Sequence, residues 1–508
     1  MRKLFLSSAL TLGVLLAVAP APAAAQPIAG NLRIGLAEDP DLLDPTLGSS
    51  FVGRIVYAAM CDKLFDLDAK LNIVPQLATG YRHESPTSLV ITLRPGVVFH
   101  DGEKLDAEAA KYKLTRDLTM KGSKRAGEIN AIQTIEVVDP LTIRLVLKAP
   151  AAQLLSQLTD RAGIMISPKA AEATGDKFGL NPVCAGPYAF DNRVAQDRII
   201  LKRHPAHWDA KNHHFERITY LPIPNSAVRL ANLQAGSLDL SFIAPSDAPT
   251  VKADPKLNLV VWDALGYTGI NFNVNNGPAA NTPIGQNALI RQAFELAIDR
   301  KALIDVVFSG MFTPTAQANP ASSPFYVPAV QPPARDIAKA KALLAQAGVT
   351  GRVPVELTVT NSQEAQQAAE VIQSMVAEAG FDLKVKVMEF ASSLQAGYSG
   401  NFQAYMIGWS GRSDADGNMW GLMHSKGTFN YGRHTNPAMD QLLDDARVAT
   451  TVEDRRAIYA KVWEMQRRDL PLIYLYGGKH IVGIQKGLTG FQPVPDGLLR
   501  LGGMRFGG

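Results

Sequence analysis

The sequence of 508 residues is poor in the groups that build metal clusters or mark nucleotide and nucleic-acid sites. It has only two cysteines, Cys61 and Cys184, and neither has a Cys or His neighbour at ligand spacing. Charged residues make up 19%, the formal net charge is +4, and no Lys/Arg run is long enough to follow a phosphate backbone. No H-E-x-x-H, G-x-x-x-x-G-K-[ST] or G-x-G-x-x-G motif occurs. These absences argue against a zinc protease, a nucleotide-binding enzyme and a nucleic-acid-binding protein.

One long apolar run is present, and it lies at the N-terminus. Arg2 and Lys3 precede an apolar stretch at residues 4–18, and Ala23-Ala24-Ala25 fits the small-x-small rule for signal cleavage. The run is about 15 residues, whereas a spanning helix needs about 20, so a membrane anchor is the weaker alternative. The residue immediately after the cleavage site is Gln26 and not a Cys, which argues against a lipoprotein. We predict a signal peptide at residues 1–25 and a mature periplasmic chain that begins at Gln26.

Export changes how the two cysteines are interpreted. In an oxidising compartment an even pair of cysteines is usually bonded. We therefore predict a disulfide between Cys61 and Cys184, with two buried free thiols as the alternative.

Apolar periodicity and capping residues predict an α/β protein. The segment 353–390 reads as strand, helix and strand, which favours a parallel sheet. A long Pro-rich segment at 314–336 is expected to be pinned on the surface. The expected strands are 32–37, 88–99, two within 134–148, 353–360, 381–390 and 471–477. The expected helices are 106–120, 225–236, 289–310, 335–348, 362–380, 437–450 and 452–470.

No catalytic constellation is evident. The stretch GWSGR (408–412) approaches the nucleophile elbow G-x-S-x-G, but Arg412 stands where the second glycine is required. Four histidines gather at 204, 207, 213 and 214; such tracts can bind metal, but their spacing provides no helical i, i+4 pair. A solvated, turn-rich loop with incidental histidines is the favoured interpretation of this tract.

Several stretches, taken in order, resemble the peptide/nickel/opine solute-binding proteins of ABC importers, also called family 5. The first is GVVFHDGEKLDAEAAKYKLTR (96–116), a turn followed by a capped helix, and the second is CAGPYAF (184–190). The others are 233–240, 270–275, 290–300, 336–348 and 436–443. No single motif is decisive, but the ordered set is specific and covers nearly the whole mature chain.

The resemblance implies a two-lobed periplasmic-binding-protein fold of the large cluster-C type, with an extra domain inserted in lobe one. The chain would cross between lobes near Leu265-Gly266 and Gly477-Gly478, and the predicted disulfide would tie the entry of the extra domain to its exit. The expected divisions are 26–58, 182–264 and 480–508 for lobe one, 59–181 for the extra domain, and 265–479 for lobe two.

The resemblance also implies a function. The chain would be a monomer that holds a peptide or peptide-like solute between the lobes and delivers it to a permease with cytoplasmic ATPases. It would need no cofactor or metal and would not be an enzyme. A metal- or haem-carrying protein of the same fold is the alternative, and a secreted hydrolase is the weaker one.

The solute site is expected around the segment GWSGRSDADGNMW (408–420). A tryptophan can be core packing instead, and Asp414 and Asp416 can simply cap the loop backbone. The candidates are Trp409, Ser410, Arg412, Asp414 and Trp420, with Asn361, Asn430 and Tyr431 as weaker ones.

Arg412 departs from the family pattern. Members that bind di- and oligopeptides place an Asp at this loop position, where it pairs with the peptide ammonium. The dipeptide-binding members also hold the peptide carboxylate with an Arg. That Arg lies just before the helix that corresponds to the predicted helix at 362–380, whereas here the stretch at this place is TVTNSQ (358–363), which has no Arg. Because a guanidinium suits carboxylate or phosphate, we predict that Arg412 meets an anionic group of an acidic peptide or of a glutathione-like or opine-like compound. The alternative is an internal pair with Asp414 or Asp416.

Overall fold

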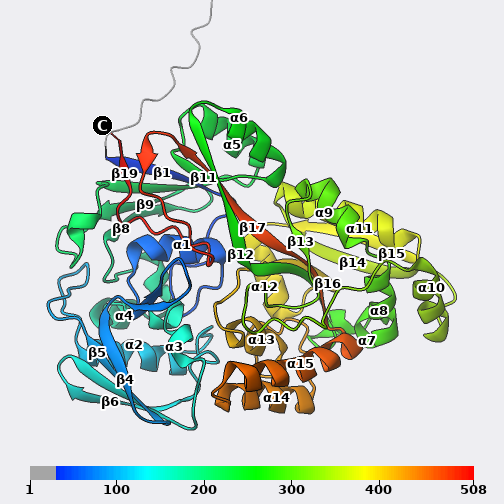
Figure 1. Cartoon of the computed structure of the whole chain (residues 1–508), viewed down its shortest axis with the longest axis horizontal. Helices are drawn as coiled ribbons and strands as arrows, with labels where there is room; N and C mark the ends of the chain where they lie inside the picture. The colour runs from blue at the N-terminus through cyan, green and yellow to red at the C-terminus, as the bar shows by residue number, and fades with distance from the viewer. Residues whose placement is uncertain (1–29, 508) are drawn as a thin grey trace, which may run out of the picture.

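The computed structural model describes residues 30–507, so the predicted signal peptide (1–25) lies outside the described residues. One large sheet runs through the molecule in the order β15-β14-β16-β12-β17-β11-β1-β10-β9-β8 (Figure 1). We call the side from β11 to β8 lobe one and the side from β15 to β16 lobe two. The strands of lobe one are β1 (Asn31–Leu36), β8 (Tyr188–Val194), β9 (Arg198–Arg203), β10 (Arg217–Pro222) and β11 (Leu240–Phe242). Those of lobe two are β14 (Val353–Thr360), β15 (Phe381–Met388) and β16 (Ala404–Trp409).

The α/β prediction is confirmed, and its helices begin where capping side chains start them. β14 and β15 are parallel and are joined by α11 (Gln363–Ala377), as strand-helix-strand patterning predicts. The Ser362 side chain accepts a hydrogen bond from the backbone of Ala365 and so caps α11. Asn225 caps α5 (Ser226–Gln234) in the same way.

Two long strands connect the lobes. β12 (Leu257–Phe272) and β17 (Leu472–Gln485) are antiparallel and cross the centre of Figure 1 in green and red. Their register shifts between Asp263 and Tyr267, close to the expected crossing at Leu265-Gly266. Gly266 is required there, because a Cβ atom would lie 2.0 Å from the backbone oxygen of Trp409. The strand expected at 471–477 continues past Gly477 into lobe one.

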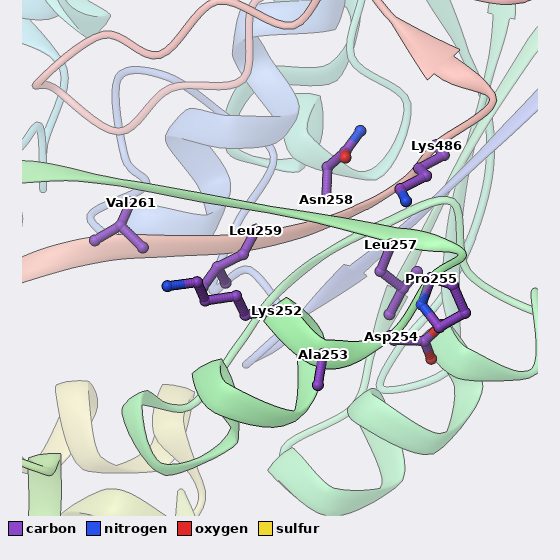
Figure 2. A pocket seen from close by; sticks show the side chains of 9 residues that line it. All are labelled: Lys252, Ala253, Asp254, Pro255, Leu257, Asn258, Leu259, Val261 and Lys486. Carbon is purple, nitrogen blue, oxygen red and sulfur yellow. The ribbon is translucent and has the colours of Figure 1, made fainter.

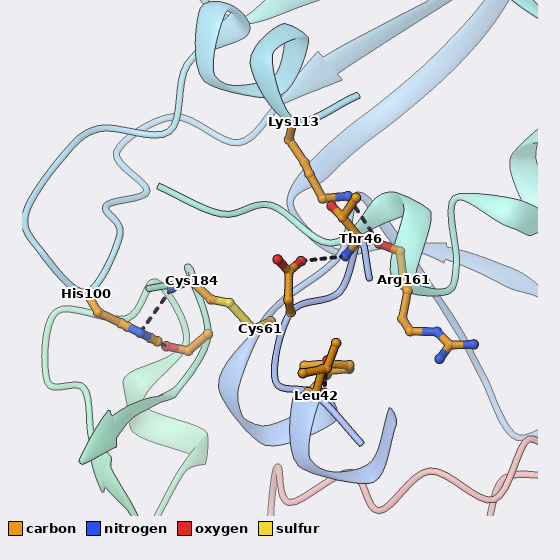
Figure 3. Close-up of a disulfide and its surroundings, with 10 residues drawn as sticks. Leu42, Thr46, Cys61, His100, Lys113, Arg161 and Cys184 are labelled. Atoms are coloured by element: carbon orange, nitrogen blue, oxygen red, sulfur yellow. Dashed lines mark hydrogen bonds between the residues drawn. A yellow bond between two sulfur atoms is a disulfide. The ribbon is translucent and has the colours of Figure 1, made fainter. Parts of the chain in front are cut away.

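The extra domain lies against lobe one and has its own core. A four-stranded antiparallel sheet, β4-β5-β7-β6, packs against α2 (Ala107–Thr119), which Asp106 caps as predicted. The bounds are β4 (Ala78–Ser85), β5 (Ser88–Leu93), β6 (Ile132–Asp139), β7 (Thr142–Leu147), α3 (Leu154–Gln157) and α4 (Pro168–Thr174). The predicted disulfide between Cys61 and Cys184 is present and joins the end of α1 (Phe51–Met60) to the exit of this domain (Figure 3).

The helix predicted over 289–310 is wrong in one respect, because two helices cover this segment. α8 (Ala288–Leu296) ends, and Asp299 caps a new helix, α9 (Arg300–Phe308), by accepting a hydrogen bond from Ala302. The break lets the Arg300 guanidinium donate 2.9 Å to the backbone oxygen of Tyr474 in β17.

Lobe two also carries a layer of helices beside the extra domain. The Pro-rich segment at 314–336 is pinned as expected, because the side chain of Gln317 is buried and donates to the backbone oxygens of Val327 and Val330. No helix within residues 30–507 combines the length and the apolar character that crossing a membrane requires. The remaining helices of lobe two are α10 (Ile337–Gln346), α12 (Phe390–Ser399), α13 (Asp416–Met423), α14 (Pro437–Val448) and α15 (Val452–Asp469).

Candidate ligand-binding site

The loop between β16 and α13 faces the extra domain, and one asparagine holds its shape. The Asn418 side-chain oxygen accepts from the backbone nitrogen of Arg412 at 2.7 Å and from Trp409 Nε1 at 3.1 Å. Its amide donates back to the backbone oxygen of Arg412 at 3.0 Å. Gly411 adopts φ +76° and lies against the backbone of Leu265, so only a glycine fits there. Asn418 was not among the predicted site residues.

The loop contacts residues from lobe one and the extra domain. Ser410 Oγ accepts a hydrogen bond of 3.0 Å from Arg54, which projects from α1. The Nε atom of Arg412 pairs with Asp160 Oδ2 of the extra domain. The hydroxyls of Ser413 and Ser156 are hydrogen bonded at 3.1 Å. Predicted site residues therefore sit at the junction of the two lobes.

Four arginines and two acids form a buried group at this junction, which we call the arginine cluster. Asp160 also accepts from Arg54 Nε at 3.0 Å, and Arg161 Nε lies 3.9 Å from it. Arg125 pairs with Glu128 at 2.5 Å. The members are Arg54, Arg125, Arg161, Arg412, Asp160 and Glu128.

Burial and like charges set the electrostatics of this cluster. Burial, followed by repulsion from Arg54, lowers the pKa of Arg412 to about 9. Burial alone would raise the pKa of Asp160, but the attraction of Arg412 and Arg54 holds it well below its usual range. Asp160 is therefore a carboxylate at neutral pH.

Neither aspartate of the loop pairs with Arg412. Both carboxylate oxygens of Asp414 accept from Arg455, at 2.6 and 2.7 Å. Asp416 accepts from Arg447 at 2.6 and 3.0 Å. The expected alternative of an internal pair with Asp414 or Asp416 is therefore wrong, because arginines of α14 and α15 occupy both acids.

The two tryptophans line a small cavity between the extra domain and lobe two. Lys124, Glu128 and Gln157 form the facing wall. The free volume is about 20 Å³, room for about one water molecule. The Trp409 ring lies 4.9 Å from the Arg412 guanidinium, so it borders the arginine cluster as well. Trp420 is more deeply packed, since its indole nitrogen donates to Asp444 at 2.8 Å and Arg447 stacks 4.0 Å over its ring.

The weaker candidates lie within lobe two. The Asn430 side chain is hydrogen bonded to the backbones of His424 and His434. Tyr431 packs in an aromatic group, 5.3 Å from Tyr398. Asn361 follows β14, and among the described residues no hydrogen bond joins it to the loop at 410–415.

Side chains also bridge the two sides of the cavity. Gln157 Nε2 donates to Asp416 at 3.0 Å. Arg447 donates to the Asn130 side chain at 2.9 Å and to the backbone oxygen of Gly127 at 3.1 Å. The lobes are therefore closed against each other here.

An open hollow lies elsewhere, beside α6 (Ala248–Ala253) and the first half of β12 (Figure 2). Lys252, Asp254, Leu259 and Lys486 are among the residues that line it. No predicted site residue does so.

The histidine tract is a turn-rich loop with many exposed residues, as predicted, but one of its histidines is buried. His207 is buried, and its Nε2 atom lies 2.8 Å from Asp62 Oδ2. His213 packs 5.4 Å from it, and His204 packs 5.0 Å from His100. His204 and His213 are half-buried and His214 is exposed, so among these four histidines only His207 is buried. Across residues 30–507, no group of three or more His, Cys, Asp or Glu side chains is placed to hold a metal ion.

Known proteins show the same organisation. The family model "Bacterial extracellular solute-binding proteins, family 5 Middle" matches residues 72–430. A glutathione-binding protein GsiB from Salmonella paratyphi A is 29% identical over 500 residues, which cover 96% of each chain. A GsiB from Escherichia coli O6:K15:H31 is 27% identical over 483 residues, which cover 92% of this chain and 93% of that protein.

Solved structures have the same overall fold. The binding protein AgaA of A. tumefaciens R10 with agropinic acid is 26% identical, with a TM-score of 0.85 over 94% of this chain and 99% of that one. DppA of Helicobacter pylori with the peptide STSA has a TM-score of 0.86 at 22% identity over 94% of this chain and 98% of that one, which bears on the fold alone. The chain belongs to the bacterial extracellular solute-binding proteins, family 5, the solute-binding components of ABC importers.

Proposed function

We propose that this protein captures a peptide or peptide-like small solute between its lobes in the periplasm and delivers it to an ABC permease with its ATPase subunits. The observation that carries this proposal is that Trp409, Ser410 and Arg412 of lobe two meet Arg54 and Asp160 of the other side at one closed junction. The relatives named for glutathione and agropinic acid support a small, carboxylate-bearing solute. The protein acts as a monomer and binds its solute without turnover.

Closure would proceed as a rigid-body motion about the two crossing strands. The first body would comprise the described parts of 26–58, 182–264 and 480–508 together with the extra domain (59–181), and the second body residues 265–479. β12 and β17 join the two bodies and bend where their register shifts. A solute that contacts both bodies favours the closed form by its differential affinity. Closure excludes water and so strengthens each charged contact.

Replacing Trp409 should remove the optical signature of binding. With glutathione as the probe, we expect wild-type protein to change its tryptophan fluorescence on titration while mass spectrometry finds the compound unaltered. Trp409→Phe should lose most of that change, because the Trp409 ring lines the cavity. Trp409→Ala should weaken binding by roughly tenfold, the size expected for one lost aromatic contact.

Trp208 provides the matched control. Its ring is 37% exposed and stacks on Arg94, away from the cavity. Trp208→Phe should keep both affinity and fluorescence change. Unchanged binding in both Trp409 variants would show that the site is misplaced, and conversion of the probe to a product would identify an enzyme.

A further inference from the structure

We infer that the arginine cluster is an anion site. In it, Arg125, Arg161 and Arg412 bind one or two carboxylate groups at one end of the solute. This inference rests on the proposed function and specifies the chemistry of its solute. It also goes beyond Arg412 alone, since the other arginines come from distant parts of the chain.

The charge balance of the cluster is the first reason. Its four guanidinium groups face two carboxylates, Asp160 and Glu128, and within the described residues no other carboxylate lies within 4.0 Å of them. Two positive charges therefore lack a counter-charge. The arginines are 0–8% exposed, so bulk water does not neutralise them. A buried charge without a partner is costly, and an anionic ligand would remove that cost.

The hydrogen-bond balance is the second reason. Arg125 Nε, Arg161 Nε and Arg412 Nη2 are buried and have no acceptor among the described residues. Buried donors are almost always bonded in native proteins, and an unbonded one costs about 1–3 kcal/mol. Three such donors within one cluster could each be satisfied by an acceptor that the solute brings. A carboxylate has two oxygens that accept several N–H groups and matches the planar guanidinium fork.

The position of the cluster is the third reason. Glu128 and Trp409 line the interlobe cavity and also contact cluster members, so the cavity and the cluster adjoin. Gly417 lines the cavity too, and a Cβ atom there would lie 2.6 Å from Arg412 Cγ. The glycine thus leaves room for Arg412 to fold back toward Asp160.

The members also come from both moving bodies. Arg54 lies on α1, Arg125 and Arg161 belong to the extra domain, and Arg412 belongs to lobe two. An anion held by these groups would draw the two bodies together. The same contact would then provide affinity and favour closure.

Neutral variants of the cluster test the inference. The probes are two matched pairs: glutathione against its glycine monoethyl ester, and the dipeptide Gly-Glu against Gly-Gln. We expect wild-type protein to bind at least one acid member roughly tenfold or more tighter than its blocked partner. Arg412→Gln and Arg161→Gln should weaken that binding by roughly 30-fold or more and abolish the preference, because each removes a charged donor from the buried carboxylate of the solute. Arg412→Lys should keep part of the preference, since it keeps the charge but not the fork.

Arg300→Gln is the control, because Arg300 is a buried, ion-paired arginine of lobe two outside the cluster. It should lose stability without losing affinity. Should Arg161→Gln fail to fold, the two Arg412 variants decide the result. Equal affinity for acid and blocked members, wild-type affinity in the Arg412 variants, or a co-purifying solute without a carboxylate group would overturn the inference and leave the proposed function intact. If no solute of any charge binds or co-purifies, the proposed function itself fails.

Discussion

Replacing Cys61 and Cys184 together by serine is expected to lower the free energy of unfolding by about 5 kcal/mol. The bond joins residues 123 apart, and the chain-entropy model assigns about that value to a closed loop of this length. Both cysteines are almost fully buried, at 2% and 0% exposure, so two serine hydroxyls would also have to be buried. The closed loop comprises nearly the whole extra domain. Loss of the bond therefore increases the conformational entropy of the unfolded chain mainly in this domain.

Urea unfolding of the oxidised protein, the reduced protein and the double variant measures this effect. The reduced wild type should unfold at a urea concentration close to that of the variant. Adding reductant to the variant should change nothing, which controls for effects elsewhere in the chain. Equal midpoints for the oxidised protein and the double variant would contradict the prediction.

Local chemistry made much of the fold predictable. Asp106, Asn225 and Ser362 each begin a helix in the structure, because a short polar side chain accepts a bond from the first helical turn. The two strands flanking Asp139-Pro140 were also predictable, because the alternation of apolar and polar residues stops at this turn dipeptide. In these places the decisive interactions lie within a few residues.

The errors arose where tertiary contacts compete with periodicity. The apolar spacing of 289–310 continues across Ala297–Asp299, yet the chain breaks there because Asp299 caps and Arg300 reaches β17. The histidine tract is turn-rich as expected, but Asp62 holds the His207 ring out of solvent while Trp208 and His214 stay exposed. No pattern within either segment reveals the partner that decides its structure.

The residues of the candidate site likewise fall into those that the local sequence predicted and those that only the tertiary fold reveals. The segment 408–420 pointed to Trp409, Ser410 and Arg412, which do meet the opposite side of the junction. Asp160 and Arg54, their partners, could not be found from sequence, because pairing across several hundred residues depends on the whole fold. The two aspartates looked like natural partners for Arg412, yet Arg455 and Arg447 occupy them.

Acidification is expected to destabilise the protein steeply between pH 6.5 and pH 4. Burial lowers the pKa of His100, His213 and His480 to about 4, from 6.5 in the unfolded chain. Their folded forms are neutral, so the stability that they contribute is fully present above pH 6.5 and is lost as the pH falls toward 4. A complete shift of this size corresponds to roughly 3 kcal/mol for each histidine.

His100 shows the structural cost of protonation. Its Nδ1 atom accepts a hydrogen bond of 3.3 Å from the backbone of Cys184 (Figure 3). Its Nε2 atom lies 3.0 Å from the backbone oxygen of Gly186. Only the neutral ring can accept from Cys184 while donating to Gly186. A second proton would break the bond to Cys184 beside the disulfide.

Glu38 opposes this trend, and the balance decides the size of the effect. Burial, partly offset by Arg229, raises the pKa of Glu38 to about 8, from 4.5 in the unfolded chain. Its contribution is therefore complete below pH 4.5 and is lost as the pH rises to 8, so acidification restores roughly 3 kcal/mol across the same range. One acid offsets about one of the three histidines. The net loss between pH 6.5 and 4 is then about 5–6 kcal/mol.

Urea unfolding at a series of pH values from 7 to 4 measures this balance, and two variants separate its parts. His480→Gln should flatten the dependence, because it removes one buried ring that acid must charge. Glu38→Gln should steepen it, because it removes the opposing group. The exposed His83, replaced by Gln, is the matched control. A free energy of unfolding that stays constant between pH 6.5 and 4 would show that these histidines are hydrated in the folded protein, and the two test variants would then share the wild-type slope.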